Sequence, residues 1–154
     1  FVFFLLGCSF SFEEALSNAG IYLRHVDEGK NVAMYRTNIP LEPVGPFAGH
    51  MVVSMRPIAN DKVQLAAEIT GKYPDVHGAP IQIGNPGSIG IKQIENPDYG
   101  EFVQIKLNET PVFWACGVTP QNVVRKAKLP LAISHAPGYM FVSDIKNSEY
   151  AVSR

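Results

Sequence analysis

Two cysteines occupy matching places in this sequence, and their thiols are candidates for catalytic chemistry. Cys116 follows the short apolar run at 111–115, which is typical of a buried strand, and Gly117 comes next. Thr119 can then cap a helix over residues 121–128. A thiol in such a turn lies beside unpaired backbone N–H groups and the positive helix end, which favour a thiolate and a bound anion. The other interpretation is that Cys116 is a small buried apolar residue.

Cys8 repeats this arrangement near the start of the chain. The apolar run 1–6 predicts a strand, and Ser11 with Glu14 has the spacing of a capping box for the helix that follows. A second interpretation of FVFFLLGC is the tail of a lipoprotein signal with Cys8 as the lipidated residue, but no basic region precedes it. We favour a core strand whose upstream partners are missing, and we expect both thiols to face one crevice.

Two arginines are candidates for binding a carboxylate. Arg36, Thr37 and Asn38 combine a guanidinium with hydroxyl and amide donors, which suits an anionic substrate; the alternative is a solvated sheet edge. Arg56 follows the predicted strand 51–55 and precedes a predicted helix. It is therefore a second carboxylate ligand or a surface ion-pair partner.

Two histidines lie in turns that contain small residues and proline. His77 and His135 are candidates for proton transfer, although an imidazole that only bonds the backbone is at least as common. Asp144, near the end of a predicted strand, is a candidate for orienting one of these rings.

These residues need a scaffold of short strands and helices. The periodicity predicts an α/β fold, with a mixed sheet and strand–turn–helix units, as part of a larger two-layer or three-layer domain. A helix is expected from about residue 60 to 72, closed at its start by Asn60 or Asp61. The other strands are expected at residues 21–26, 31–39, 81–83, 101–107, 130–134 and 139–145.

Composition excludes several function classes. The 154 residues suffice for one domain, and a net charge of −1 provides no basic surface for nucleic acid or an anionic membrane. Two distant cysteines do not form a disulfide framework, and four scattered histidines predict no metal site. We therefore expect a cofactor-free cytoplasmic protein, or a mitochondrial matrix protein if the source is an animal. The sequence does not decide whether the protein is a homo-oligomer.

Six sequence blocks resemble, in order, the D-glutamate cyclase family, many of whose bacterial members are catalogued as hydro-lyases. The blocks are GCSFSFEEAL (7–16), VAMYRTNIP (32–40), VVSMRPI (52–58), VHGAPIQIG (76–84), PVFWACGVTPQ (111–121) and ISHAPGYMFVSD (133–144). The resemblance implies an α/β protein without a redox cofactor that closes D-glutamate to 5-oxo-D-proline with loss of water. It covers part of a longer family domain, so residues 1–154 are expected to be one domain truncated at its N-terminus.

The residues are compatible with that reaction on a small amino or dicarboxylic acid. Arg36 or Arg56 would hold the α-carboxylate, backbone N–H groups around 116–119 would stabilise the oxyanion, and His77 or His135 would move protons. One alternative is a two-thiol racemase that uses Cys8 and Cys116. The others are β-elimination of water from a hydroxy acid and a non-catalytic carboxylate-binding module.

Overall fold

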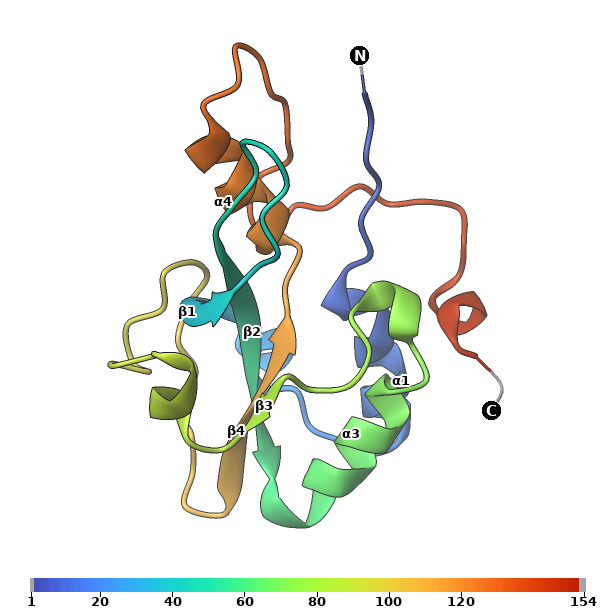
Figure 1. Ribbon diagram of the computed structural model, residues 1–154. Coiled ribbons are helices and arrows are strands. Elements are labelled where there is room, and N and C mark those ends of the chain that lie inside the picture. Colours follow the sequence, from blue (N-terminus) through green and yellow to red (C-terminus); the bar gives the residue numbers. More distant parts are fainter. Residues whose placement is uncertain (1, 153–154) are drawn as a thin grey trace.

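An antiparallel sheet forms the centre of the computed structural model, which describes residues 2–152 (Figure 1). Its strands lie in the order β1-β2-β4-β3. Within the described residues every pairing between them is antiparallel, so the sheet is not the mixed sheet that the sequence predicts. The sheet and the helices together confirm the α/β class. The strands are β1 (Ala33–Pro40), β2 (His50–Ala59), β3 (Gln82–Ile83) and β4 (Glu109–Ala115).

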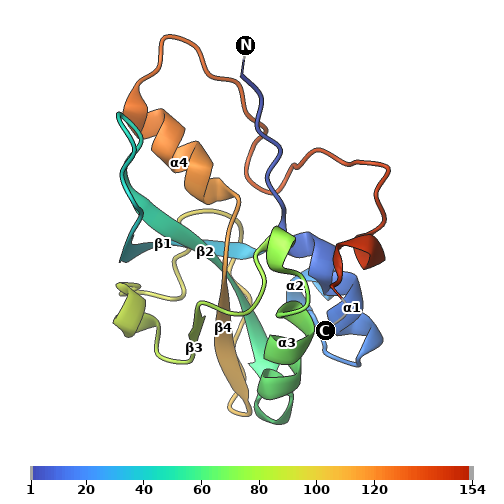
Figure 2. The ribbon, with the colours of Figure 1, turned by 45° about the vertical axis from the view of Figure 1, so that its right-hand side comes forward.

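Helices cover one face and one end of this sheet. In Figure 2, α1, α2 and α3 gather on one side of the strands, and α4 extends from the end of β4. The helices are α1 (Glu13–Asn18), α2 (Arg24–Asp27), α3 (Val63–Thr70) and α4 (Val118–Ala127). Five 3-10 turns connect these elements: η1 (Ser9–Phe12), η2 (Asn60–Lys62), η3 (Pro74–Val76), η4 (Pro86–Ile89) and η5 (Asn147–Tyr150).

Strand β2 is buried on both faces, from residue 52 to residue 58. Side chains alternate along a strand, so Val53 and Met55 join an apolar cluster on one face, while Ile58 packs with the helices on the other. Strands covered on both faces form nearly continuous apolar runs. Arg56 interrupts this run on the helix side, and a charge enclosed there needs buried partners.

The end of β2 differs from the prediction. The expected strand 51–55 continues to Ala59, so Arg56 lies inside the strand and not at its end. Strand β1 pairs with β2 only as far as Met55, and beyond that point β4 is its one neighbour. A proline is tolerated where a strand has a free side, which explains why Pro57 does not end β2.

Two other expected strands are wrong. Residues 21–26 contain α2 instead, because the Arg24 side chain turns inward to bind the carboxylate of Glu109 and the Gln104 carbonyl oxygen. Residues 101–107 run without a strand and lead into β4, which begins at Glu109.

The remaining strands were predicted with mixed success. Strands β1, β3 and β4 confirm the predictions at 31–39, 81–83 and 111–115, and η2 with α3 accounts for the predicted helix at 60–72. The expected strands 130–134 and 139–145 are not strands in the structure, and neither are residues 2–6. Phe1, which completes the predicted strand 1–6, lies outside the described residues. None of the helices described over 2–152 has the length and apolar character needed to cross a membrane.

Candidate functional site

Three chain segments meet where β4 ends and α4 begins. Gly7 packs so closely on η3 that a Cβ atom would lie 2.8 Å from the Cα of Val76 and would collide with the Asp75 carbonyl oxygen. A Cβ on Gly117 would lie 3.8 Å from the Gly7 carbonyl oxygen. These close backbone approaches bring together Cys8, His77 and Cys116, which we call the thiol site.

The turn after β4 is fixed to the middle of the sheet. The Cys116 backbone N–H donates to the Val52 carbonyl oxygen at 3.0 Å. The Thr119 hydroxyl accepts from the Val52 N–H at 2.9 Å and lies 3.2 Å from the Val52 carbonyl oxygen. The cap position of α4 is Gly117, and no side chain caps this helix. Thr119 therefore joins α4 to β2 and is not the helix cap that the sequence predicts.

Both thiols are half-buried and protonated at neutral pH. Burial raises the pKa of Cys116 to about 11, although a hydrogen bond from the Val118 backbone and the charge of Arg56 act in the opposite direction. Burial also raises the pKa of Cys8, against a hydrogen bond from the Phe10 backbone and the same arginine. The turn supplies the backbone donors expected from the sequence, but desolvation outweighs them. The sulfur atoms are therefore hydrogen donors at pH 7.

His77 provides a neutral imidazole at this site. Its backbone is left-handed, with a φ of 84°, and Gly78 follows with a φ of 63°. Burial and then the charge of Arg56 lower the pKa of His77, and a hydrogen bond with the Gly7 backbone only partly offsets them. Its Nε2 atom has no hydrogen-bond partner among the described residues. His77 can therefore accept a proton at neutral pH.

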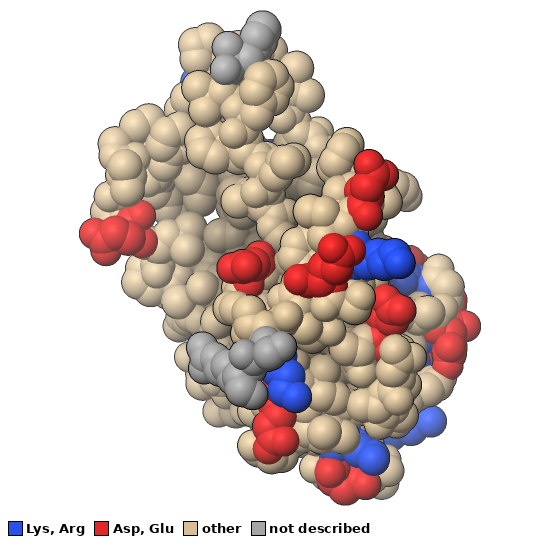
Figure 3. All heavy atoms as spheres, turned by 90° about the vertical axis from the view of Figure 1, so that its right-hand side faces the viewer, with Lys and Arg blue, Asp and Glu red and all other residues tan. Residues whose placement is uncertain are grey.

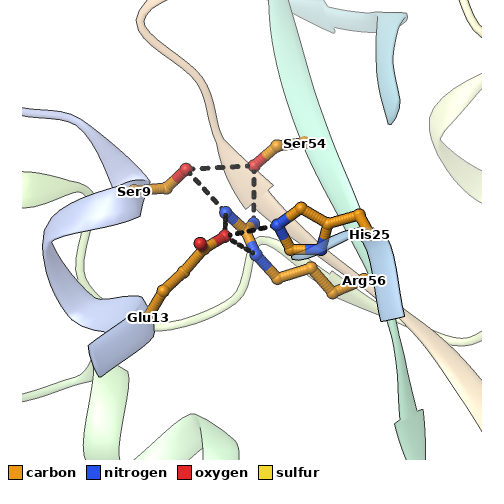
Figure 4. A network of polar contacts seen from close by, with 5 residues as sticks. All are labelled: Ser9, Glu13, His25, Ser54 and Arg56. Carbon is orange, nitrogen blue, oxygen red and sulfur yellow. Dashed lines mark hydrogen bonds and ion pairs between the residues drawn. The ribbon is translucent and has the colours of Figure 1, made fainter. Parts of the chain in front are cut away.

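Arg56 is a fully buried cation beneath the thiol site, and Figure 4 shows the side chains around it. Its Nε donates to Glu13 at 2.7 Å, its Nη1 to Ser54 at 3.0 Å and its Nη2 to Ser9 at 3.1 Å. The rings of Phe10, Phe12 and Trp114 lie 5.4 to 6.0 Å from its guanidinium carbon. These contacts stabilise the charge, but they leave no exposed guanidinium N–H group that could bind a substrate carboxylate.

The carboxylate of Glu13 contacts two basic side chains, Arg56 and His25. Its Oε1 lies 2.5 Å from Arg56 Nη2 and 3.0 Å from His25 Nε2. Burial alone would raise the pKa of Glu13, but the charge of Arg56 and the contact with His25 hold it below its ordinary value. The His25 contact is an ion-pair distance without hydrogen-bond alignment, and its Nδ1 has no partner within residues 2–152. We call Ser9, Glu13, His25, Ser54 and Arg56 the Arg56 network.

Sequence reasoning missed four of these five residues. The usable signal was the pattern VVSMRPI, in which Ser54 and Arg56 share one face of an apolar strand. Two polar side chains on a buried face imply partners from another element. The pattern does not identify Ser9, Glu13 or His25, because they come from η1, α1 and α2.

The other predicted site residues lie elsewhere. Arg36 is exposed, forms an ion pair with Asp98 at 3.7 Å and donates to the Tyr99 hydroxyl at 2.8 Å. Thr37 donates to the Met51 carbonyl oxygen, and Asn38 packs beside Gly90. His135 is exposed next to Gln121, and Asp144 is exposed on the segment after α4. The described structure therefore brings Cys8, Arg56, His77, Cys116 and Gly117 together, with Thr119 behind them, and leaves these others apart.

The thiol site does not coincide with either of two open hollows on the described surface. These hollows are lined by residues 104–108 and by a set around Tyr35 and Gly90, away from the thiols. Residues 2–152 contain no group of three or more His, Cys, Asp or Glu side chains placed to hold a metal ion.

Sequence comparison finds several bacterial relatives of this chain. A relative from Pseudomonas syringae pv. syringae, named "Putative hydro-lyase", is 58% identical over 151 residues, which are 98% of this chain and 57% of that protein. Proteins of the same description from Staphylococcus carnosus and Bacillus subtilis are 60% and 56% identical; they match 96% and 99% of this chain, and 56% and 59% of their own lengths. The chain thus spans somewhat more than half of these relatives. The sequence model of D-glutamate cyclase matches residues 2–144, and the chain belongs to the D-glutamate cyclase family.

Proposed function

We propose that the chain carries the proton-transfer part of a hydro-lyase, and that its reaction is the closure of D-glutamate to 5-oxo-D-proline. Family membership and the names of the relatives support the reaction class. The observation that carries the proposal is the thiol site, where a neutral His77 with a free Nε2 lies near two protonated thiols at the start of α4.

In this reaction, the amine nitrogen forms a bond to the γ-carboxyl carbon, and the bond from that carbon to a hydroxyl breaks to release water. The nitrogen loses two protons in all; His77 accepts each in turn and passes it to the departing carboxyl oxygen, which leaves as water, while a thiol of the site donates a hydrogen bond to that oxygen. Because both reacting groups belong to one molecule, holding the folded conformation contributes up to ~7–11 kcal/mol.

Charge stabilisation comes from two sources in this proposal. The Gly117 backbone N–H lies at the start of α4 and is assigned to the developing oxyanion, since the Cys116 N–H is already bound to the Val52 carbonyl oxygen. Arg56 adds a fixed positive charge from below, while Glu13 and the two serines hold its orientation. Arg36 is not part of this arrangement, so we assign the contact with the α-carboxylate to the helix start and to the portion of the family domain that the chain does not cover.

The test is a turnover screen on the full-length family protein with D-glutamate, L-glutamate and small hydroxy acids. Chiral chromatography detects 5-oxo-D-proline, and ultraviolet absorbance detects an alkene from β-elimination. His77→Gln should lower kcat/KM by about 10²–10⁴, whereas His50→Gln, an exposed matched control at the start of β2, should not. Full activity of His77→Gln would remove His77 from the mechanism, and D-glutamate binding without turnover would make the chain a carboxylate-binding module.

Two-thiol racemisation is the second candidate, because Cys8 lies close enough to Cys116 to raise its pKa. The reaction needs one sulfur as a thiolate base, and burial keeps both protonated. Incorporation of solvent deuterium at Cα would support racemisation, since cyclisation leaves the Cα hydrogen in place.

A further inference from the structure

Two segments that border the thiol site expose many large apolar side chains. The first is residues 2–6, which ends two residues before Cys8, and the second is residues 129–145, which follows α4; we call them the edge segments. Val2, Phe4 and Leu5 are 80% or more exposed. In the second segment, five large apolar side chains are between 64% and 87% exposed: Leu131, Ile133, Tyr139, Phe141 and Val142.

The edge segments have the sequence of strands but lie outside the sheet. Residues 2–6, 130–134 and 139–145 are rich in the β-branched, aromatic and other apolar residues that fill buried strands. In the structure, none of them belongs to the sheet of β1 to β4. A strand-forming sequence that lies outside a sheet with its apolar side chains in water can take part in strand pairing with another segment.

The course of the second edge segment is fixed by contacts with the folded body. Gln121 of α4 donates to the His135 carbonyl oxygen at 3.0 Å, and Asn31 donates to the Pro137 carbonyl oxygen at 3.3 Å. Further along, Asn147 donates to Glu14 at 3.1 Å. The apolar side chains are therefore presented from a backbone that is attached on both sides of residues 139–145.

The surface next to these segments carries few charges. In Figure 3, the upper part of the face is almost entirely free of Lys, Arg, Asp and Glu, and the charged side chains collect further down. Exposed apolar side chains on a surface with few charges are typical of an interaction site in folded proteins. Low charge also favours an occupant that packs apolar side chains and pairs its backbone with an extended segment.

We propose that the edge segments form the surface on which the remaining part of the family domain packs, adding strand pairing and closing the thiol site. The relatives supply the occupant: the chain matches 57%, 56% and 59% of three of them, so each contains a large portion without a counterpart in this sequence. Cys8 follows the first edge segment directly, and the chain after α4 passes beside that segment in Figures 1 and 2, so an occupant there lies next to the Cys8 end of the thiol site. This inference rests on family membership and is independent of the proposed reaction.

Hydrogen exchange provides a test that needs no substrate. The 154-residue chain and the full-length Bacillus subtilis relative are compared at the backbone amides of residues 2–6 and 139–145 and at the aligned positions. We expect exchange in the full-length protein to be at least about 100-fold slower at these amides. The exposed turn at residues 106–108 serves as the internal control and should exchange at similar rates in both proteins.

Equal fast exchange in both proteins would overturn the proposal. Protection in the 154-residue chain that rises with protein concentration would overturn it too, because the occupant would then be a second copy. In the full-length relative, substitutions equivalent to Phe4→Asp and Phe141→Asp should lower the melting temperature, whereas Leu107→Asp, also on a fully exposed apolar residue, should not. Equal effects of all three would show that the edge segments are not covered.

Discussion

At the scale of single residues, Arg56 is the side chain on which the arrangement beneath the thiols depends. A guanidinium with no exposed surface is tolerated because Glu13 neutralises it and Ser9 and Ser54 each accept one further hydrogen bond from it. The same charge lowers the pKa of His77 and acts on both thiols. One buried cation therefore acts on the pKa of three groups, although burial has the larger effect on each of them.

Breaking this ion pair should cost more than removing it. Glu13→Gln leaves Arg56 buried without a counter-charge, and we expect a loss of about 3–5 kcal/mol in the free energy of unfolding. Arg56→Met combined with Glu13→Gln removes both charges and should be less destabilising than the sum of these two single variants. Urea denaturation of the four proteins measures the coupling. Additive effects would mean that the pair contributes nothing specific.

Acid should destabilise the protein through two carboxylates. A hydrogen bond from Arg24 holds the pKa of Glu109 below its ordinary value, although burial acts in the opposite direction. Burial also acts to raise the pKa of Glu13, but the charge of Arg56 keeps it below its ordinary value. In the unfolded chain a glutamate titrates near pH ~4.3. The stabilisation is therefore present above that pH and disappears as the pH falls through the lower pKa values of the folded state.

The measurement is thermal unfolding between about pH 6 and pH 3, the range that brackets a free glutamate. The wild-type melting temperature should fall steeply in the lower half of this range. Glu13→Gln should have a flatter profile, while Glu42→Gln, on the loop between β1 and β2, should follow the wild type. Identical slopes for all three proteins would contradict the assignment of Glu13.

At the scale of elements, α4 is positioned by one hydroxyl. Thr119 satisfies the backbone of Val52 in the centre of the sheet, so Thr119→Val leaves a Val52 N–H without its partner. The expected cost is about 1–3 kcal/mol. Thr110→Val is a matched control, because Thr110 bonds only the exposed Asn60 side chain. Equal, small losses in chemical denaturation would show that α4 does not depend on this contact.

The approach of η1 to η3 makes Gly7 the least replaceable glycine near the thiols. Gly7→Ala would place a methyl group against the backbone of Asp75 and Val76, forcing these segments apart. Gly117→Ala would meet its neighbour only at an ordinary 3.8 Å, at a helical φ of −62°. We expect the first variant to destabilise the fold by about 1–3 kcal/mol, as overpacking does, and the second to change stability little. Urea unfolding separates these outcomes, and a tolerant Gly7 would mean that the two segments are not in contact.

The elements that sequence reasoning located and those it missed differ in a physical way. Strands β1, β3 and β4 were found because their apolar patterns end at turns, and Cys116 was placed correctly at the start of α4. The helix at Arg24 was missed because its cause is a contact with Glu109, 85 residues away in sequence. Glu13 was missed for the same reason: its role depends on Arg56, and no local pattern reports a partner on another element.

At the scale of the whole molecule, the apolar edge segments determine how the chain behaves in solution. Exposed apolar surface binds dyes such as ANS and promotes association, and salts that strengthen apolar burial increase both effects. We expect the 154-residue chain to bind ANS in its native state. The full-length relative should not. Phe4→Asp with Phe141→Asp should reduce dye binding by the chain, whereas Leu107→Asp, on the turn before β4, should leave most of it. If Leu107→Asp reduced the signal as strongly as the double variant, the dye would be reporting scattered exposed side chains and not a continuous surface beside the thiols.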